Sequence, residues 1–276
     1  MTTVSIAPLA RRMRGGFRLA RVGLHLAAGI VTVGAVYPCV RQSARLWLKQ
    51  RWSRQLVALL GVHLEVPRSP ATMRGLLVSN HISWLDIYVI HALSPAAFVC
   101  KADVRDWPVI GWLCAHTDCV FIERGSRSAA MRTTLALTEK LKSGTLAAVF
   151  PEGTTGDGNK LLPFHGALLQ AAVDAQVPLQ PICLGYYDAN GKRTETAAYC
   201  GNTTLLESIR NIVNAPALSV CAHILPPLAT EGKTRQELTR QARALIDETL
   251  QGSRAPSIPT AAIEEGALEP ALAGSD

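Results

Sequence analysis

The 276-residue sequence is poor in charged and aromatic residues, and it has no acidic residue before Glu65. Charged residues make up 18% of the chain and aromatic residues 5%, whereas 48% are hydrophobic. This composition excludes a disordered chain, a collagen and a coiled coil. The length suffices for one large domain or two small ones with a buried core. The mean hydropathy of +0.17 also suggests contact with lipid.

Several motifs are missing. The seven cysteines are odd in number and include no CxxC pair, which disfavours a disulfide framework and a structural zinc site. We therefore expect reduced, mostly buried thiols in a protein that faces the cytosol. The chain has no GxxxxGK[ST], which excludes a P-loop for nucleotides, and no GxSxG, which excludes a nucleophile elbow.

The positive charge is concentrated at the start of the chain. The formal net charge is +7, and ten basic residues precede Glu65, so the remainder carries a net charge of −3. The ten are Arg11, Arg12, Arg14, Arg18, Arg21, Arg41, Arg45, Lys49, Arg51 and Arg54. A nucleic-acid binder usually carries its basic surface on the folded domain, so this pattern disfavours one. It favours a front end that meets an anionic bilayer surface, at about 1 kcal/mol per basic residue.

Residues 1–60 are predicted to form a membrane anchor. The 19 residues from Val22 to Val40 contain no charge and are just long enough to cross a bilayer, although three glycines and Pro38 weaken this span. Basic residues flank both of its ends, so the positive-inside rule does not orient it. No convincing small-residue cleavage site follows it, which disfavours a signal peptide.

The segment 41–60 has the spacing of an amphipathic helix. Apolar residues recur every three or four positions, at Ala44, Leu48, Trp52, Leu56 and Leu59/Leu60. The other side is predicted to carry Arg45, Lys49, Ser53 and Arg54. Such a helix can pack on the domain like any other, but the cationic face with Trp47 and Trp52 favours an interfacial anchor.

Residues 61–250 alternate between short β-rich runs and helical stretches. The predicted strands are 63–66, 76–79, 97–100, 119–122, 146–150, 179–184 and 218–225, and the predicted helices are 84–93, 128–142, 166–175, 205–212 and 235–250. This alternation predicts an α/β fold with a largely parallel sheet flanked by helices. Residues 251–276 are rich in Ala, Pro, Gly and Ser and are predicted to form a disordered tail.

The segment LLVSNHISWLD, residues 76–86, has the strongest local signal for chemistry. An apolar strand ends at Asn80 and a helix is expected to begin near Ser83, which places His81 in the loop and Asp86 in the first helical turn. Sites in open α/β sheets lie at such strand ends. A His–Asp pair forms a general base, because the carboxylate fixes the tautomer and stabilises the imidazolium. Alternatively, Ser83 and Asp86 only cap the helix and His81 is a turn residue.

Two further segments carry candidate binding groups. FPEGTTGDG, residues 150–158, runs from a strand into a turn-rich loop with Glu152 at its mouth, although Glu152 could simply be solvated. Arg124 and Arg127 follow the predicted strand 119–122 and could bind a phosphate or carboxylate bidentately, or form surface ion pairs. A fourth segment, VPLQP at residues 177–181, indicates a buried strand entered through prolines.

Taken together and in this order, the four blocks resemble the glycerolipid acyltransferase family typified by 1-acylglycerol-3-phosphate acyltransferases. The matching blocks are NHxSxxD (Asn80, His81, Ser83, Asp86), an FIxRxxR-like block from Phe121 to Arg127, FPEGT from Phe150 to Thr154, and VPxxP from Val177 to Pro181. They span residues 80–181, and the resemblance extends from Val22 to about Leu250. Each block alone is weak evidence, whereas four in order are strong.

The resemblance implies transfer of a fatty acyl group from a thioester, acyl-ACP or acyl-CoA, to the hydroxyl of 1-acyl-sn-glycerol-3-phosphate, which gives phosphatidic acid. His81 would act as general base and Asp86 would orient it. Arg124 and Arg127 match the family's acceptor-headgroup arginines, and Glu152, Gly153 and Thr154 match its acceptor-binding loop. No cofactor, metal or covalent acyl-enzyme is implied. The implied location is the inner membrane, with the site facing the cytoplasm.

One position departs from the family pattern. Many members carry a basic residue directly after FPEGT, where this chain has Thr155. The missing charge weakens the expectation of a phosphate-bearing acceptor, and related bacterial enzymes acylate aminolipids such as lyso-ornithine lipid. Lysophosphatidate stays first here on family membership alone. A hydrolase using the same base and a non-catalytic lipid-binding membrane protein are the more distant alternatives.

Overall fold

The computed structural model describes residues 7–67, 73–106, 109–122 and 127–252. At its centre is a seven-stranded sheet with the order β1-β7-β6-β2-β5-β3-β4. All neighbouring strands are parallel except β6 and β7, which are antiparallel. The strands are β1 (Val62–Glu65), β2 (Leu76–Ser79), β3 (Ala97–Lys101), β4 (Val120–Ile122), β5 (Ala147–Val149), β6 (Leu179–Tyr187) and β7 (Leu218–Ile224).

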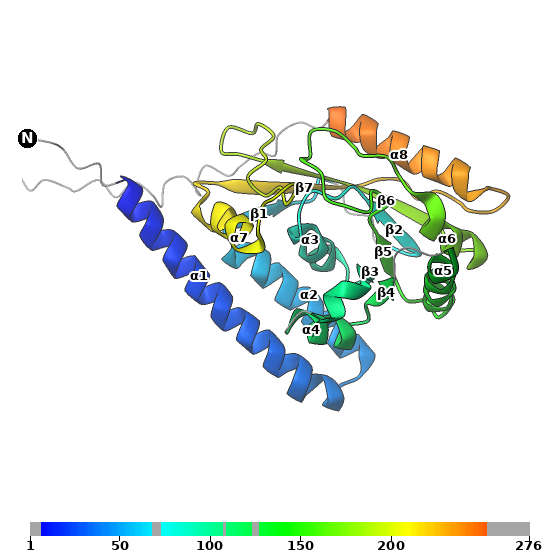
Figure 1. The fold of residues 1–276 in the computed structure, drawn as a ribbon, viewed down its shortest axis with the longest axis horizontal. Coiled ribbons are helices and arrows are strands. Elements are labelled where there is room, and N and C mark those ends of the chain that lie inside the picture. The colour runs from blue at the N-terminus through cyan, green and yellow to red at the C-terminus, as the bar shows by residue number, and fades with distance from the viewer. Residues whose placement is uncertain (1–6, 68–72, 107–108, 123–126, 253–276) are drawn as a thin grey trace, which may run out of the picture.

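Helices cover both faces of this sheet (Figure 1). They are α1 (Ala7–Val31), α2 (Gln42–Leu59), α3 (Leu85–Leu93), α4 (Ile110–His116), α5 (Arg127–Lys142), α6 (Gln170–Asp174), α7 (Leu205–Asn214) and α8 (Arg235–Gly252). The shorter η elements are η1 (Thr32–Val36), η2 (Tyr37–Cys39), η3 (Ala102–Asp106) and η4 (Gly166–Leu169). The fold class predicted from the sequence is confirmed, and each predicted strand lies within two or three residues of an observed one.

The two faces of the sheet form separate halves of the core because side chains alternate along each strand. In β2, Leu77 packs with apolar residues of α2, α3 and α7. Its neighbours Leu76 and Val78 face the opposite way and pack with residues of α5, α6 and α8. This burial on both sides explains why β2 has no polar residue before Ser79. Helix α4 was missed because seven residues are too few to show a period.

Helix α2 joins this core. Leu56, Val57 and Leu60 are buried in the cluster that contains Leu77. The predicted polar face is wrong for two residues, because Lys49 and Ser53 are buried at 7% and 1% exposure. The Lys49 ammonium donates a 2.8 Å hydrogen bond to the Thr117 carbonyl, which satisfies the cation inside the protein. The alternative of a helix packed on the domain is therefore confirmed for this part of α2.

Helix α1 runs along α2 and reaches α7 (Figure 1). The ring of Trp52 stacks on His25 at 4.7 Å between centroids, and its indole nitrogen donates to the His25 carbonyl. Gly29 permits this close approach, since a Cβ there would lie 2.7 Å from the indole nitrogen. At the other end, Arg18 donates to the Val213 carbonyl.

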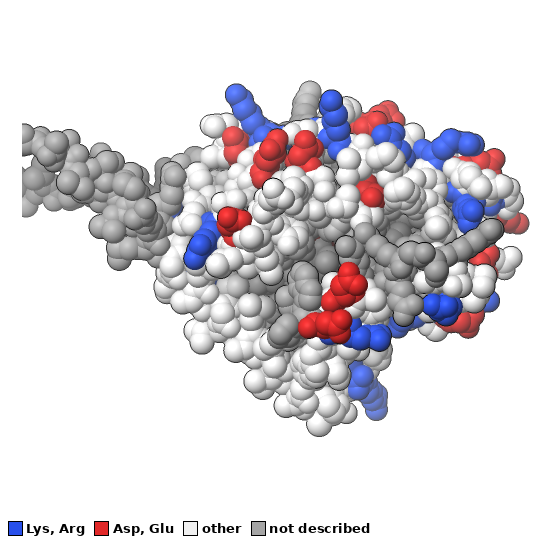
Figure 2. Space-filling view, in the orientation of Figure 1, with Lys and Arg blue, Asp and Glu red and all other residues white. Residues whose placement is uncertain are grey.

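The stretch Arg14–Cys39 is long and apolar enough to cross a membrane, and most of it is not buried in the protein. Large apolar side chains are exposed along it, among them Leu24 and Val31. Figure 2 shows an almost uncharged surface over the later part of α1, at the lower left of the view. A signal sequence has a similar length and apolar composition.

Candidate active site

The candidate site is built on the turn that leads from β2 into α3. Asn80 follows β2, and its buried side chain pairs with the backbone of Leu184 in β6 through two hydrogen bonds of 2.8 and 2.9 Å. This amide clamp fixes the end of β2 against β6. It thereby fixes the backbone from which His81 projects.

His81 and Asp86 meet as the sequence predicted. Nδ1 of His81 lies 3.0 Å from Oδ2 of Asp86, and the carboxylate is fully buried while the imidazole keeps 17% exposure. Because an ionised carboxylate only accepts hydrogen bonds, this contact places the imidazole proton on Nδ1 and the lone pair on Nε2. Among the described residues, no hydrogen bond to Nε2 is found. Nε2 is therefore the ring nitrogen left to accept a proton.

The Asp86 carboxylate also receives three other hydrogen bonds. Oδ2 accepts from the backbone N–H of Ile82 at 2.6 Å and of Ser83 at 2.8 Å, and Oδ1 accepts from the hydroxyl of Tyr186 at 2.7 Å. The two backbone bonds stabilise the start of α3. One oxygen of this carboxylate thus contacts both the His81 ring and the backbone at the start of α3.

Glu152 is hydrogen-bonded to the backbone of this turn. The alternative of a solvated side chain is wrong, because Glu152 is only 5% exposed. Its Oε1 accepts from the backbone N–H of His81 at 2.7 Å, and its Oε2 accepts from that of Leu162 at 2.8 Å. Burial raises the pKa of Glu152 above its ordinary value, although the two backbone donors partly oppose this shift. The carboxylate thus ties the 150–162 loop to the backbone of His81.

The ring of His81 is held from one side by Phe150. The two rings stack with centroids 3.8 Å apart and planes within 6°. Phe150 in turn stacks on Phe98 of β3, at 5.6 Å. The loop after β5 closes the arrangement, since Gly156 donates to the His81 carbonyl at 2.8 Å. Ring orientation is therefore set by both packing and hydrogen bonding.

The other predicted binding residues are in the loop after Glu152 and at the start of α5. Gly153 and Thr154 follow Glu152 and are exposed at the surface of the loop, and Gly153 adopts a φ of +69°. Thr155, at the position where the family pattern has a cation, donates its hydroxyl hydrogen to the Tyr199 carbonyl. Arg127 begins α5, and Arg124 lies outside the described residues.

Sequence reasoning missed Tyr186 as part of the site. It lies in β6, 100 residues from Asp86, in the strand that Asn80 clamps. Burial raises the pKa of Tyr186 well above its ordinary value, and the neighbouring Asp86 adds to the shift. The phenol therefore stays protonated and donates. A tyrosine at the end of a buried strand carries no local signal for this role.

Comparison with known proteins gives a consistent picture. The family model "Acyltransferase" matches residues 63–185. The chain is 35% identical over 243 residues to a lyso-ornithine lipid O-acyltransferase of Pseudomonas aeruginosa, which covers 87% of this chain and 92% of that protein. It is 40% identical over 148 residues to a 1-acyl-sn-glycerol-3-phosphate acyltransferase of Neisseria meningitidis, covering 53% of this chain and 58% of that protein.

The fold is also similar to a solved structure. The crystal structure of the 1-acyl-sn-glycerophosphate acyltransferase PlsC from Thermotoga maritima superposes with a TM-score of 0.68 at 22% identity. The alignment covers 88% of this chain and 96% of that chain. At this identity the similarity shows a shared fold and says nothing of the substrate.

Proposed function

The chain belongs to the acyltransferase family, and we propose that it transfers a fatty acyl group from a thioester donor to the free hydroxyl of a membrane lysolipid. The observation that carries this proposal is the pairing of His81 with Asp86, in which Nδ1 is held by the carboxylate and the imidazole keeps 17% exposure. Hydroxyls are poor nucleophiles near neutral pH, so the reaction needs a positioned base at this point.

In the proposed reaction, Nε2 of His81 takes the proton of the acceptor hydroxyl as its oxygen attacks the thioester carbonyl. The new ester C–O bond forms and the C–S bond breaks, and the proton passes from His81 to the departing thiolate. Asp86 stabilises the imidazolium formed in between, because its buried charge lies 3.0 Å from Nδ1. The backbone donors and Tyr186 hold this carboxylate in place.

The loop that follows β5 is proposed to position rather than react. Glu152 uses both carboxylate oxygens on backbone N–H groups, so its contribution is to hold His81 and the loop together. Gly153 and Thr154 are exposed residues of this loop, and we propose that they meet the acceptor headgroup, as the family pattern implies. Arg124 and Arg127 are proposed to bind an anionic part of the acceptor, as the family pattern implies.

For the acceptor we propose lyso-ornithine lipid first and 1-acyl-sn-glycerol-3-phosphate second, the reverse of the order expected from the sequence. Two observations support this order. The P. aeruginosa protein, matched over 92% of its length, bears the first name, and Thr155 offers a neutral hydroxyl turned toward the Tyr199 carbonyl. The second acceptor is supported by the 40% identity to the N. meningitidis protein.

The donor is proposed to be acyl-ACP or acyl-CoA, and the reaction itself needs no metal or cofactor. We further propose that the apolar stretch Arg14–Cys39 and the basic residues around it hold the site at the cytoplasmic face of the inner membrane. Lysolipid acceptors are concentrated there. Such attachment would bring the base to the bilayer surface that holds the acceptor.

The test is acyl transfer by the full chain purified in detergent. Each labelled donor, acyl-ACP and acyl-CoA, is offered with either acceptor in parallel, using the unchanged chain and the His81→Ala variant. We expect acylated lyso-ornithine lipid, with kcat lowered in His81→Ala by about 10²- to 10⁴-fold, the contribution of a general base. Circular dichroism checks that the variant is folded.

Each outcome decides one element of the proposal. Product from lysophosphatidate alone would replace the first acceptor with the second and keep the mechanism. Full activity in a folded His81→Ala variant would refute the assignment of the base. Release of free fatty acid without either acceptor would indicate a hydrolase. No turnover with any pair would favour a non-catalytic lipid-binding protein.

A further inference from the structure

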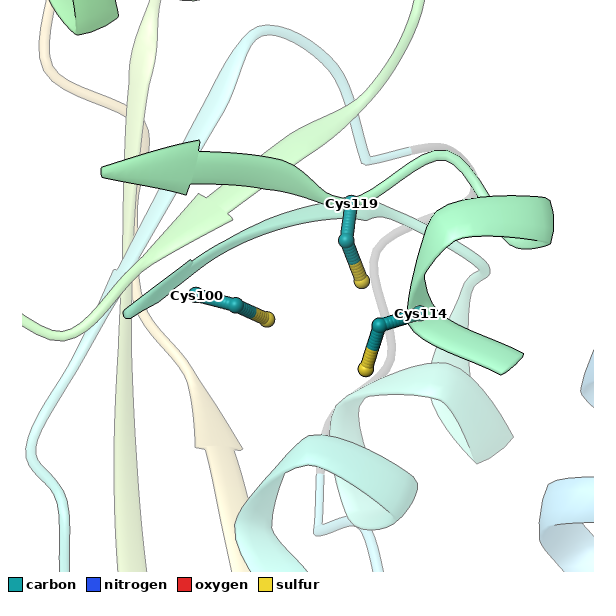
Figure 3. A group of neighbouring side chains, drawn as sticks. All are labelled: Cys100, Cys114 and Cys119. Atoms are coloured by element: carbon teal, nitrogen blue, oxygen red, sulfur yellow. The ribbon is translucent and has the colours of Figure 1, made fainter. Parts of the chain in front are cut away.

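Three cysteine side chains from different elements converge beside the edge of the sheet. Cys100 lies in β3, Cys114 in α4, and Cys119 immediately before β4. Their Sγ atoms all lie within 4.8 Å of one another. Figure 3 shows the side chains of Cys100 and Cys119 directed into the space that Cys114 also borders. All three are half-buried and none forms a disulfide.

We propose that Cys100, Cys114 and Cys119 bind one zinc-type divalent ion through three thiolates, with a water molecule as the fourth ligand. This proposal is independent of acyl transfer. It departs from the expectation drawn from the sequence, which found no CxxC pair and therefore no zinc site. The spacings of 14 and 5 residues do not match the usual zinc-ribbon patterns, because the site is assembled from a strand, a helix and the residue that precedes the next strand.

The geometry suits this class of ion. A zinc ion sits about 2.3 Å from each thiolate sulfur, so the sulfurs of a tetrahedral site lie about 3.8 Å apart. The observed sulfurs, all within 4.8 Å of one another, are close to that spacing. Half-burial of the three residues leaves room for solvent at the fourth position, while it removes the thiols from bulk water.

The local charge also suits it. Three thiolates around a divalent ion leave one net negative charge. The buried ammonium of Lys49 faces this group from α2 and is close enough to Cys119 for their charges to interact. Lys49 is also 3.6 Å from Asp118, whose carboxylate is partly exposed and thus better screened. The buried cation beside the cluster would offset part of that negative charge.

A divalent ion binds thiolates, so its binding at this cluster would release the protons of the three thiols to solvent. The bound ion would connect β3, α4 and the edge strand β4.

The experiment uses the full chain in detergent, reduced with a phosphine and stripped of metal with a chelator. Titration with Co²⁺ is followed by absorption, and bound Zn²⁺ is measured after competition with a chromophoric chelator. We expect about one ion per chain, a thiolate-to-cobalt charge-transfer band with the pattern of a tetrahedral site, and displacement of Co²⁺ by Zn²⁺. The melting temperature should rise when Zn²⁺ is added.

The matched variants are Cys119→Ser and Cys114→Ser against Cys200→Ser, a half-buried cysteine outside the cluster. We expect the first two to lose the charge-transfer band and the bound equivalent, and Cys200→Ser to keep both. Zinc binding that survives in folded Cys119→Ser would overturn the proposal. So would the absence of a thiolate band in the unchanged chain. A disulfide between two of the three that persists under cytosol-like reducing conditions and excludes Zn²⁺ would overturn it as well.

Discussion

The phenol of Tyr186 donates a 2.7 Å hydrogen bond to Oδ1 of Asp86, the carboxylate oxygen that His81 does not use. The tyrosine stands in β6 and the aspartate in α3, so the bond joins a central strand to the helix that carries the acid. Both side chains are buried. Asp86 is therefore held from two directions, and its orientation toward His81 depends on the packing of α3 against the sheet.

Tyr186→Phe is expected to weaken both stability and turnover, because it leaves Oδ1 of a buried carboxylate without this donor. A hydrogen bond to a charged group contributes about 1.5–3 kcal/mol, and the unfolding free energy should fall by that order. We expect kcat to fall with little change in KM, since Tyr186 acts through Asp86. Urea unfolding and steady-state kinetics measure the two effects. Tyr199→Phe is the control, and an equal loss of kcat there would contradict the prediction.

Asp86→Asn is expected to remove most of the activity while preserving the shape of the site. An amide has one acceptor oxygen, whereas the carboxylate uses both of its oxygens as acceptors. The NH2 group of the asparagine would therefore face either the Tyr186 hydroxyl or the donors of His81, Ile82 and Ser83. We expect kcat to fall by about 10²-fold or more and the imidazole to lose its preferred tautomer. The ¹⁵N chemical shifts of the His81 ring report that tautomer directly. An unchanged tautomer with lost activity would assign Asp86 a different role.

Glu152→Gln is expected to lower the unfolding free energy at neutral pH by about 1–3 kcal/mol. The reason is that Glu152 accepts from the N–H groups of His81 and Leu162, whereas glutamine offers only one acceptor oxygen. Glu152→Ala would also remove the side chain's packing, so the glutamine variant is the cleaner probe. Chemical denaturation followed by fluorescence measures the change. An unfolding free energy equal to that of the unchanged chain would show that these two hydrogen bonds do not stabilise the fold.

The raised pKa of Glu152 also predicts a pH dependence with a definite sign. Since the folded state binds this proton more tightly than the unfolded state, Glu152 adds stability at low pH and loses this contribution as the pH rises through the raised pKa. Activity should move the other way, because the charged carboxylate holds His81 more firmly. Both slopes should be absent in Glu152→Gln. Parallel pH series of unfolding and of kcat test this, and a slope retained in the variant would assign it to another group.

Leu24→Glu with Val31→Glu is expected to weaken attachment to membranes. Both side chains are exposed on the apolar stretch of α1, and burial of a large aliphatic side chain contributes about 1.5–3 kcal/mol. Binding to anionic vesicles in a flotation assay should fall by at least about tenfold. The matched control is Met131→Glu with Leu135→Glu, two equally exposed apolar residues on α5. Equal loss in the control would show that α1 has no special role.

Thr155→Lys is expected to shift acceptor preference toward lysophosphatidate. The change supplies a cation directly after Thr154, at the price of the hydrogen bond to the Tyr199 carbonyl. We expect the ratio of kcat/KM for lysophosphatidate over lyso-ornithine lipid to rise by about tenfold. Thr155→Ser keeps the hydroxyl donor and should leave the ratio unchanged. A ratio that does not move in Thr155→Lys would place acceptor recognition elsewhere.

The sequence by itself predicted the order of strands and helices along the chain, apart from α4, and the location of the candidate base. Both predictions rest on short segments of the chain. The continuous apolar run of β2 indicates a strand buried on both faces, and His81 and Asp86 are only five residues apart. The turn itself is dictated by where β2 ends and α3 begins. Such local patterns survive without knowledge of the rest of the fold.

Only the tertiary structure decided which distant groups complete the site and the cysteine cluster. Tyr186 lies 100 residues from Asp86, and Glu152 lies 71 residues from His81. The inward turn of Lys49 depends on a carbonyl 68 residues away, and the three cysteines meet only where β3, α4 and β4 pack. The physical reason is that the free energy of these contacts comes from burial and pairing, which no single segment possesses before the segments meet.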